Sequence, residues 1–304
     1  MGYKKPTEVT KVYLENQPLP NHGKSYTVIS HKQVIDNTKI LLENSGFTIR
    51  KEVYRANMNA QVAQGVYHIY PTQSIDDQIN DETELGMMFA WTNSYDKSTR
   101  FQCAIGAHVI VCSNGLIAGD MMNFKRKHVG SADYDMIMQL SNQIKNGEKR
   151  YKSIITDRDS LKNTVLSKRK QSELLGRLFA DEEIITSTQI SCIKKEMDKP
   201  SYDYNCDDDN AWAFYNHVTH SLKKSPPKNW MQDTQDFHDF MMTEVVTQPS
   251  ANLSGDVDFS NLKTTVDETF DIADVEDIVN EKTGAIEIDE DITPTQLIHD
   301  MYSS

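Results

Sequence analysis

His108 and Cys112, in the run HVIVCSNG, are the residues whose types could support nucleophilic chemistry, because an imidazole base activates a thiol. The intervening residues 109–111 are β-branched and favour a strand. On a strand, a spacing of four places the two side chains on one face but ~13 Å apart, at ~3.3 Å per residue, too far for proton transfer. Asn114-Gly115 is typical of a hairpin turn. We therefore expect Cys112 to be a buried residue at a strand end, and we assign no catalytic residue.

The candidate metal ligands in the sequence are Cys206 with the acidic run 207–209, and His217 with His220. No second Cys or His pair stands at ligand spacing, and an acidic run before a helix is better explained as a cap and a complement to the helix dipole. Phosphate loops, dinucleotide-binding turns, zinc-protease helices and nucleophile elbows do not occur in the sequence. We expect no metal, no cofactor and no enzyme, with a thiol or metal enzyme built on Cys112 as an open alternative.

The net charge of -13 is unevenly distributed along the chain. Residues 251–304 hold 14 Asp or Glu and 2 Lys, a net of -12, whereas residues 124–170 hold 12 Lys or Arg against 5 acids, a net of +7. Clustered cations can follow a phosphate backbone, although a charged helix face is often merely solvated. The predicted nucleic-acid-binding residues are Lys125, Arg126, Lys127, Lys149, Arg150, Lys152, Lys168, Arg169 and Lys170.

Five aromatic residues in the strand-rich part of the chain could stack on bases or form the core. The same positions suit both roles, so the alternatives stay open at the level of the sequence. They are Tyr67, Tyr70, Phe89, Trp91 and Phe101.

The elements that would position these residues follow a simple order. Residues 1–29 are polar and predict a loosely ordered arm. Ser30 with Gln33 forms a capping box for a helix that ends near Gly46. Alternating and apolar runs then predict an antiparallel sheet four to six strands wide, and helical periodicity returns after residue 130. The expected strands are FTIRKEVYR, QVAQGVYHIYP, ELGMMFAWTN, TRFQCAIG and HVIVCSNGLIAG.

The organisation predicted from these patterns is a single α+β domain over residues 30–250, with a twisted antiparallel sheet backed by helices. Residues 251–304 form an acidic tail that we expect to be disordered up to about residue 290. The tail ends in TPTQLIHDMYSS, which predicts a short amphipathic helix that binds a partner or packs back on the domain. Its apolar residues are Leu297, Ile298, Met301 and Tyr302.

The cellular setting follows from three negative features of the sequence. No stretch approaches the ~20 apolar residues of a membrane span, and the first thirty residues lack the apolar core of a signal peptide. The four cysteines form no Cys-x-x-Cys pair. We expect a protein with reduced thiols in a cytoplasm, without membrane association.

Two stretches, residues 92–114 and 211–224, resemble the phage/plasmid-like family of domains of unknown function numbered 932. The resemblance covers roughly residues 30–245 and departs at His108, where the family often has Arg, and at Gly115. It implies a phage, prophage or plasmid origin and action in a bacterial host, and it supplies no catalytic residues. The residues that carry it are Thr92, Asn93, Ser94, Asp96, Val111, Cys112, Asn114, Trp212, Tyr215, Asn216 and Thr219.

These observations lead to two functional hypotheses. The first is a phage-encoded protein that binds nucleic acid, single-stranded DNA in particular, in replication or recombination. The order of helix, strands and basic helix is similar to that of phage single-strand annealing proteins. A homo-oligomer would suit such an annealing function. In this hypothesis the acidic tail competes with nucleic acid, or its tip recruits a host or phage replication protein. The second is a protein-interaction module, virion-associated or acting in host takeover.

Overall fold

The structure is a computed structural model of the chain. Two units separate along the sequence, residues 1–248 and residues 249–304. The structure describes residues 7–21, 28–73, 79, 82–118 and 132–246. The whole acidic tail, including Leu297, Ile298, Met301 and Tyr302, therefore lies outside the described residues, and so do Lys125, Arg126 and Lys127.

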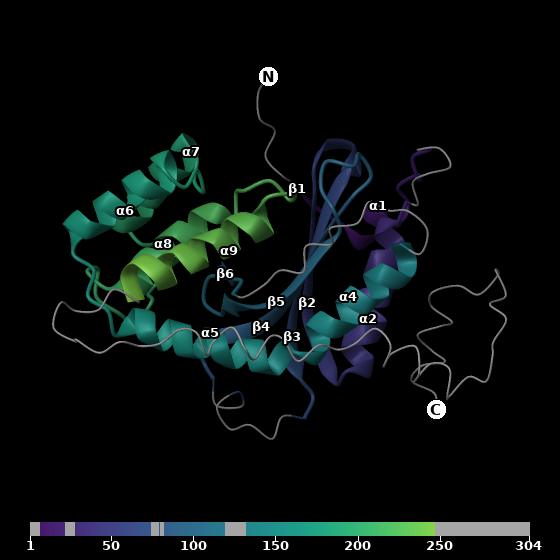
Figure 1. Ribbon diagram of the computed structural model, residues 1–304, viewed down its shortest axis with the longest axis horizontal. Coiled ribbons are helices and arrows are strands. Elements are labelled where there is room, and N and C mark those ends of the chain that lie inside the picture. The colour runs from purple at the N-terminus through teal and green to yellow at the C-terminus, as the bar shows by residue number, and fades with distance from the viewer. Residues whose placement is uncertain (1–6, 22–27, 74–78, 80–81, 119–131, 247–304) are drawn as a thin grey trace, which may run out of the picture. The chain divides into compact units, whose positions relative to one another are not determined.

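A six-stranded antiparallel sheet forms the centre of the first unit (Figure 1). Each strand pairs with its neighbour in sequence, so that the strand order is β1-β2-β3-β4-β5-β6. The predicted α+β class and antiparallel sheet are confirmed. The strands are β1 (Thr7–Val9), β2 (Phe47–Ala56), β3 (Val62–Pro71), β4 (Leu85–Ser94), β5 (Gln102–Val109) and β6 (Gly115–Leu116).

Helices cover both faces of this sheet (Figure 1). One face packs against α2, α4 and α5, and we call it face A; α9 packs against β6 on the other side, face B, and contacts α8. The helices are α1 (Lys11–Glu15), α2 (His31–Asn44), α4 (Ala132–Lys145), α5 (Gly147–Lys162), α6 (Lys168–Ala180), α7 (Ser187–Asp198), α8 (Ala211–Leu222) and α9 (Trp230–Met241), with short helical turns η1 (Met58–Ala60) and η2 (Met242–Val246).

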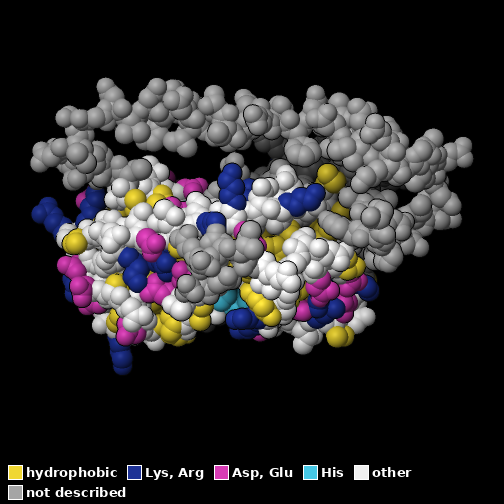
Figure 2. Space-filling model, turned by 90° about the horizontal axis from the view of Figure 1, so that it is seen from below, with side chains coloured by type: hydrophobic (Ala, Val, Ile, Leu, Met, Phe, Trp, Pro, Cys, Tyr) yellow, Lys and Arg dark blue, Asp and Glu magenta, His cyan; other side chains and the backbone are white. Residues whose placement is uncertain are grey.

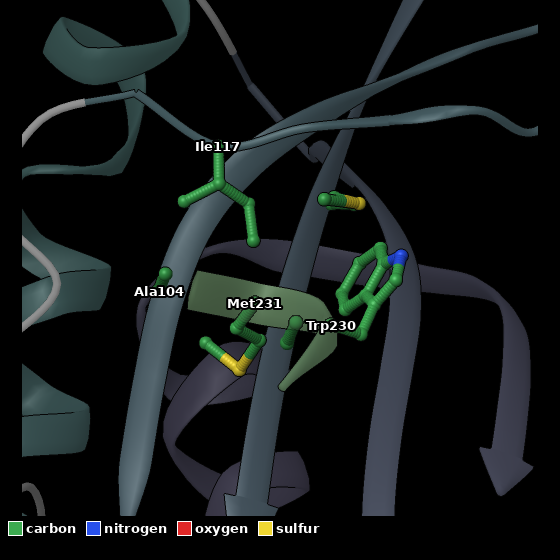
Figure 3. Packing of buried hydrophobic residues seen from close by; sticks show 6 residues of the cluster. Ala104, Ile117, Trp230 and Met231 are labelled. Atoms are coloured by element: carbon green, nitrogen blue, oxygen red, sulfur yellow. The ribbon is translucent and has the colours of Figure 1, made fainter. Parts of the chain in front are cut away.

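The part of face B beneath α9 is apolar. Met88 and Ala104 lie on the sheet, and Ile117, Trp230 and Met231 pack on them (Figure 3). All five side chains are at most 5% exposed. Burial at roughly 25 cal/mol per Å² of apolar surface makes such a cluster a main source of stability, and it fixes where α9 crosses the sheet.

The start of the chain is more ordered than its composition predicts. Thr7–Val9 pair with β2, Thr10 caps α1 by accepting a hydrogen bond from the Tyr13 amide, and Leu14 is fully buried. The expectation of a loosely ordered arm is therefore wrong for residues 7–15. The reason is tertiary: β2 offers an unpaired edge, which a short polar segment can occupy through main-chain hydrogen bonds alone.

Local start and stop signals predicted α2 correctly. Ser30 and Gln33 form the reciprocal capping box, and Gly46 adopts a left-handed φ of 81° just after the helix. Two helices that periodicity did not single out, α6 and α7, have equally clear signals: Ser167 caps α6, and Thr186 with Gln189 forms a capping box for α7. Reading these caps would have located both.

The strand expected at TRFQCAIG continues into the next expected strand as β5, which ends at Val109. The rest of HVIVCSNGLIAG is a turn followed by the short strand β6, which pairs back on β5. Ile110 and Val111 are 51% and 53% exposed in a turn, and Ser113 has a φ of 57°. Val109 pairs with Leu85, which is the first residue of β4. Residues 110 and 111 therefore have no partner in β4, and their strand propensity alone does not extend β5. The ~13 Å separation of His108 and Cys112 therefore does not apply.

None of the helices in the described part of the chain combines the length and apolar character that a membrane-spanning helix requires.

Candidate functional site

The described basic residues of the prediction lie in two separate groups. Lys149, Arg150 and Lys152 are in the first turns of α5, and residues 168–170 begin α6. The rest of α5, about 15 Å of helix at ~1.5 Å per residue, and a short connection lie between them along the chain. On the face that Figure 2 shows, Lys and Arg side chains stand in small groups among acidic and uncharged ones. On that face, the Lys and Arg side chains do not form one continuous basic patch.

Most of the sheet aromatics belong to the core and not to a stacking surface. Tyr67, Phe89 and Trp91 are fully buried and Phe101 is 2% exposed, so the core alternative holds for these four. Tyr70 is the exception, because it is only half-buried near the end of β3.

A β-bulge in β2 creates a basic surface beside Tyr70 on face B. The register with β3 shifts between Ile49 and Lys51, so Arg50 is the extra residue of the bulge. Lys51 pairs with His68, and the Arg50 guanidinium lies 4.2 Å from the centroid of the Tyr70 ring. Since His68 and Tyr70 are two apart on one strand, they share a face. The bulge therefore turns two consecutive cations to the same side of the sheet.

A half-buried histidine extends this surface and is supported by a buried one. The ring of His68 on β3 stacks on that of His108 on β5, with centroids 3.7 Å apart and planes at 25°. Gly86 of β4 lies opposite His108 and makes room for the ring, since a Cβ there would be 2.4 Å from its Nε2 atom. We call the group formed by Arg50, Lys51, His68, Tyr70 and His108 the basic aromatic strip.

The strip is positively charged at neutral pH. Burial, assisted by the Lys51 charge, lowers the pKa of His68 to about 4. Burial, assisted by His68 and Lys51, lowers the pKa of His108 to about 3. Both imidazoles are therefore neutral at pH 7. Arg50 and Lys51 are exposed and supply the positive charge, while the half-buried His68 ring offers a flat, partly apolar surface backed by the buried His108.

A second group of residues, which we call the motif junction, joins the turn after β5 to α8. It comprises Cys112, Asn114, Trp212, Tyr215 and Asn216. The Asn114 side chain donates hydrogen bonds to the Asn216 carbonyl oxygen at 3.0 Å and to Asn216 Oδ1 at 3.2 Å. Both asparagines are fully buried. The two stretches that resemble the family thus meet across 102 residues of sequence.

Helix α8 connects the motif junction to two further helices. The Trp212 ring stacks on Tyr215 at 5.6 Å, and the Tyr215 hydroxyl and His238 Nδ1 share a 3.0 Å hydrogen bond. His238 Nε2 lies 3.4 Å from the Asp157 carboxylate. Burial raises the pKa of Tyr215, so its hydroxyl stays protonated. This Asp-His-Tyr chain, in which Tyr215 and His238 are buried and Asp157 is partly exposed, ties α5, α8 and α9 together.

Cys112 has the environment of a structural residue. Its side chain is buried, and burial raises the pKa of the thiol. Lys223 donates to the Cys112 carbonyl oxygen at 3.0 Å. A thiol held protonated in this way is a poor nucleophile, because reactivity requires the thiolate.

Asn93 and Asp96, the other residues of the resemblance, also act locally. The Asn93 amide lies 3.0 Å from the carbonyl oxygen of Ile29 and 3.0 Å from His31 Nδ1. The His31 ring stacks on Tyr95 at 3.9 Å. Asp96 accepts a hydrogen bond from the Ser98 amide within the turn after β4. These contacts fix the start of α2 against the end of β4.

A polar cavity of about 330 Å³ adjoins the motif junction, between the loop that leads to α8 and that helix itself. Cys206 and His217 both line it. In the described part of the chain, no group of three or more His, Cys, Asp or Glu is arranged to hold a metal ion. The cap of α8 is Asn210, which accepts a hydrogen bond from the Trp212 amide, and not a residue of the acidic run 207–209.

Comparison with protein families gives one match. The family model described as a domain of unknown function, DUF932, matches residues 18–249, well over half of the chain. The chain belongs to the DUF932 family. The matched DUF932 region contains every described strand and helix from α2 to η2, including the basic aromatic strip and the motif junction. Searches of curated proteins and of solved structures find no match to the chain.

Proposed function

We propose that this DUF932 protein binds single-stranded nucleic acid, single-stranded DNA in particular, without catalysing a reaction. The observation that carries the proposal is the basic aromatic strip, in which a bulge presents two exposed cations beside the half-buried rings of His68 and Tyr70, and His68 stacks on the buried His108. Single-strand binding surfaces combine cations for phosphates with flat side chains on which bases stack. Lys149 and Lys168 would add weaker phosphate contacts outside the strip.

Arg50 and Tyr70 suit single strands better than a duplex. A guanidinium plane on an aromatic ring extends the stacking surface, and both flat groups accept an unpaired base without sequence preference. Bases inside a duplex are stacked on one another and present only their edges. The setting proposed with this function is the one that the family resemblance implies: a phage-encoded protein acting in replication or recombination in the cytoplasm of a bacterial host.

The rival function, a protein-interaction module, predicts a different outcome of the same measurement. It requires no affinity for oligonucleotides and predicts a complex that survives nuclease treatment.

The decisive experiment measures anisotropy of a labelled single-stranded oligonucleotide across a salt series. Binding should weaken with a slope of log K against log salt of about -0.7 per neutralised phosphate. The double substitution Arg50→Ala/Lys51→Ala should reduce the magnitude of the slope by about 1.4, at two phosphates. Its matched control is Lys194→Ala/Lys195→Ala, which removes the same charge from exposed positions on α7.

Two results would contradict the proposal: no binding by the full chain at low salt, or an equal loss in the α7 control. A chain ending at Ser250 forms a further arm. It lacks the net charge of -12 carried by residues 251–304, so it should bind more tightly at low salt and converge on the full chain as salt screens the charge.

A further inference from the structure

The basic aromatic strip repeats one arrangement twice along β3. At one position the Arg50 guanidinium lies 4.2 Å from the centroid of the Tyr70 ring. At the other position Lys51 pairs with His68 across the two strands, and the His68 ring stacks on the buried His108. Each position therefore combines one exposed cation with one half-buried ring. We call the two combinations the Tyr70 module and the His68 module.

The spacing of the two modules is set by β3. His68 and Tyr70 are two residues apart on this strand, whose pairing with β4 shows no shift in register from Val62 to Ile69. Two residues of a regular strand span ~6.6 Å, at ~3.3 Å per residue. Bases that are stacked on each other in one strand of a duplex are only ~3.4 Å apart. The step between the modules is therefore about twice the step between stacked bases.

This spacing determines what a nucleic-acid strand must do to occupy both modules. Each ring already has a neighbouring side chain on it, Arg50 on Tyr70 and His108 on His68, so each module accepts a single base. A strand with consecutive bases on the two modules must separate these bases from each other. It gives up one contact between bases and gains two contacts between a base and a ring. The loss is greater for adenine than for thymine, because purines stack on each other more strongly than pyrimidines do.

We infer that the strip binds two consecutive nucleotides of an extended, unstacked single strand, and that it consequently prefers thymine-rich strands to adenine-rich ones. The inference rests on the proposed function, because it concerns the same surface. One base lies on each module, and Arg50 and Lys51 contact the neighbouring phosphates. The preference requires no hydrogen bond to the edge of a base. Each module alone accepts any base, and the stacking within the free strand is what opposes binding to both.

The test compares the affinities of the full chain for oligo-dT and oligo-dA of equal length, by fluorescence anisotropy over a series of salt concentrations. The two probes carry the same number of phosphates, so the electrostatic contribution largely cancels in the ratio of their affinities. We expect oligo-dT to bind at least about fivefold more tightly than oligo-dA, which is ~1 kcal/mol at 1.4 kcal/mol per factor of ten. The ratio should change little with salt, although both affinities fall.

Variants connect the preference to the pair of modules. Tyr70→Ala and His68→Ala each leave one ring, which a base can contact while it stays stacked on its neighbour, so the ratio should fall towards one. Tyr70→Phe keeps the ring and should keep the ratio. The matched control is Tyr202→Ala. Tyr202 is also half-buried and has Lys223 Nζ 5.9 Å from its ring centroid, but it lies in the loop before α8, and its removal should leave the ratio unchanged.

The outcomes distinguish this inference from the proposed function. If neither probe binds at low salt, the proposed function fails and the inference fails with it. If both probes bind and oligo-dA binds as tightly as oligo-dT, single-strand binding stands and the two-nucleotide arrangement is overturned. The arrangement is also overturned if Tyr70→Ala and His68→Ala keep the ratio of the unaltered chain, or if Tyr202→Ala lowers it as much as they do.

Discussion

The basic aromatic strip and the motif junction are built in opposite ways. The strip consists of ordinary Arg, Lys, His and Tyr residues on sheet strands, and its cations face solvent. The motif junction holds the residues that look most like chemistry in the sequence, among them Cys112 and Asn114, and it is closed to solvent. Residues that look like a catalytic motif in the sequence can instead hold distant segments together in the core. A binding surface can be formed by residues that belong to no sequence motif.

The motif junction should respond to substitution with the largest change in stability. Trp212→Ala removes a ring that is 1% exposed and stacked on Tyr215, and large-to-small changes of this kind cost about 3–5 kcal/mol. Urea unfolding should show this loss, while the oligonucleotide affinity of the folded fraction stays unchanged. Val165→Ala, at a position 76% exposed, is the control and should change stability by less than about 0.5 kcal/mol. A loss of affinity in Trp212→Ala would make the motif junction part of the binding surface.

Acid should destabilise the protein more through His108, which belongs to the strip, than through His217, which follows Asn216 of the motif junction. The folded protein holds the pKa of His108 at about 3, mainly through burial and then through His68 and Lys51, whereas the unfolded ring titrates near 6.5. Unfolding therefore takes up a proton below pH 6.5, and stability is lost as pH falls from 6.5 towards 3. At 1.36 kcal/mol per unit, this loss reaches about 3 kcal/mol at pH 4.

His108→Asn tests this difference, because it removes the titrating group. The drop in unfolding free energy between pH 7 and pH 4 should be smaller in the variant than in the unaltered chain. His217→Asn should have the weaker effect, since Glu196 and Asp208 oppose the lowering of the pKa of His217 by burial. A larger effect at His217 would reverse the comparison.

The smallest of these effects concerns the gap that the histidine stack fills. Gly86→Ala places a Cβ 2.4 Å from His108 Nε2, and overpacking of this kind costs about 1–3 kcal/mol. It should separate the rings and weaken oligonucleotide binding. Gly176→Ala on α6 is the matched control: an added Cβ meets nothing within 4 Å, and the helix should gain up to about 1 kcal/mol. Unchanged binding in Gly86→Ala would exclude the stacked pair from the binding surface.

Much of the fold could be predicted from local signals. The strand-forming runs of β2 to β4 and the capping box at Ser30 and Gln33 are properties of neighbouring residues, and the structure contains both the strands and the cap. The wrong interpretation at residues 110–112 arose because β-branched residues favour a strand only where a partner strand exists. The candidate site was less predictable, because a bulge that turns Arg50 and Lys51 to one side depends on pairing with β3.

The sequence by itself determined the fold class, the main helices and strands, the family resemblance and the segregation of charge, since each depends on residue type and short-range spacing. Only the tertiary structure decided which aromatics are buried, that Asn114 meets Asn216, and that Arg50, Tyr70 and the two stacked histidines share one surface. Such contacts join residues from different strands and helices, and strand register and helix docking, which create them, are set by the whole core and not by any local run of residues.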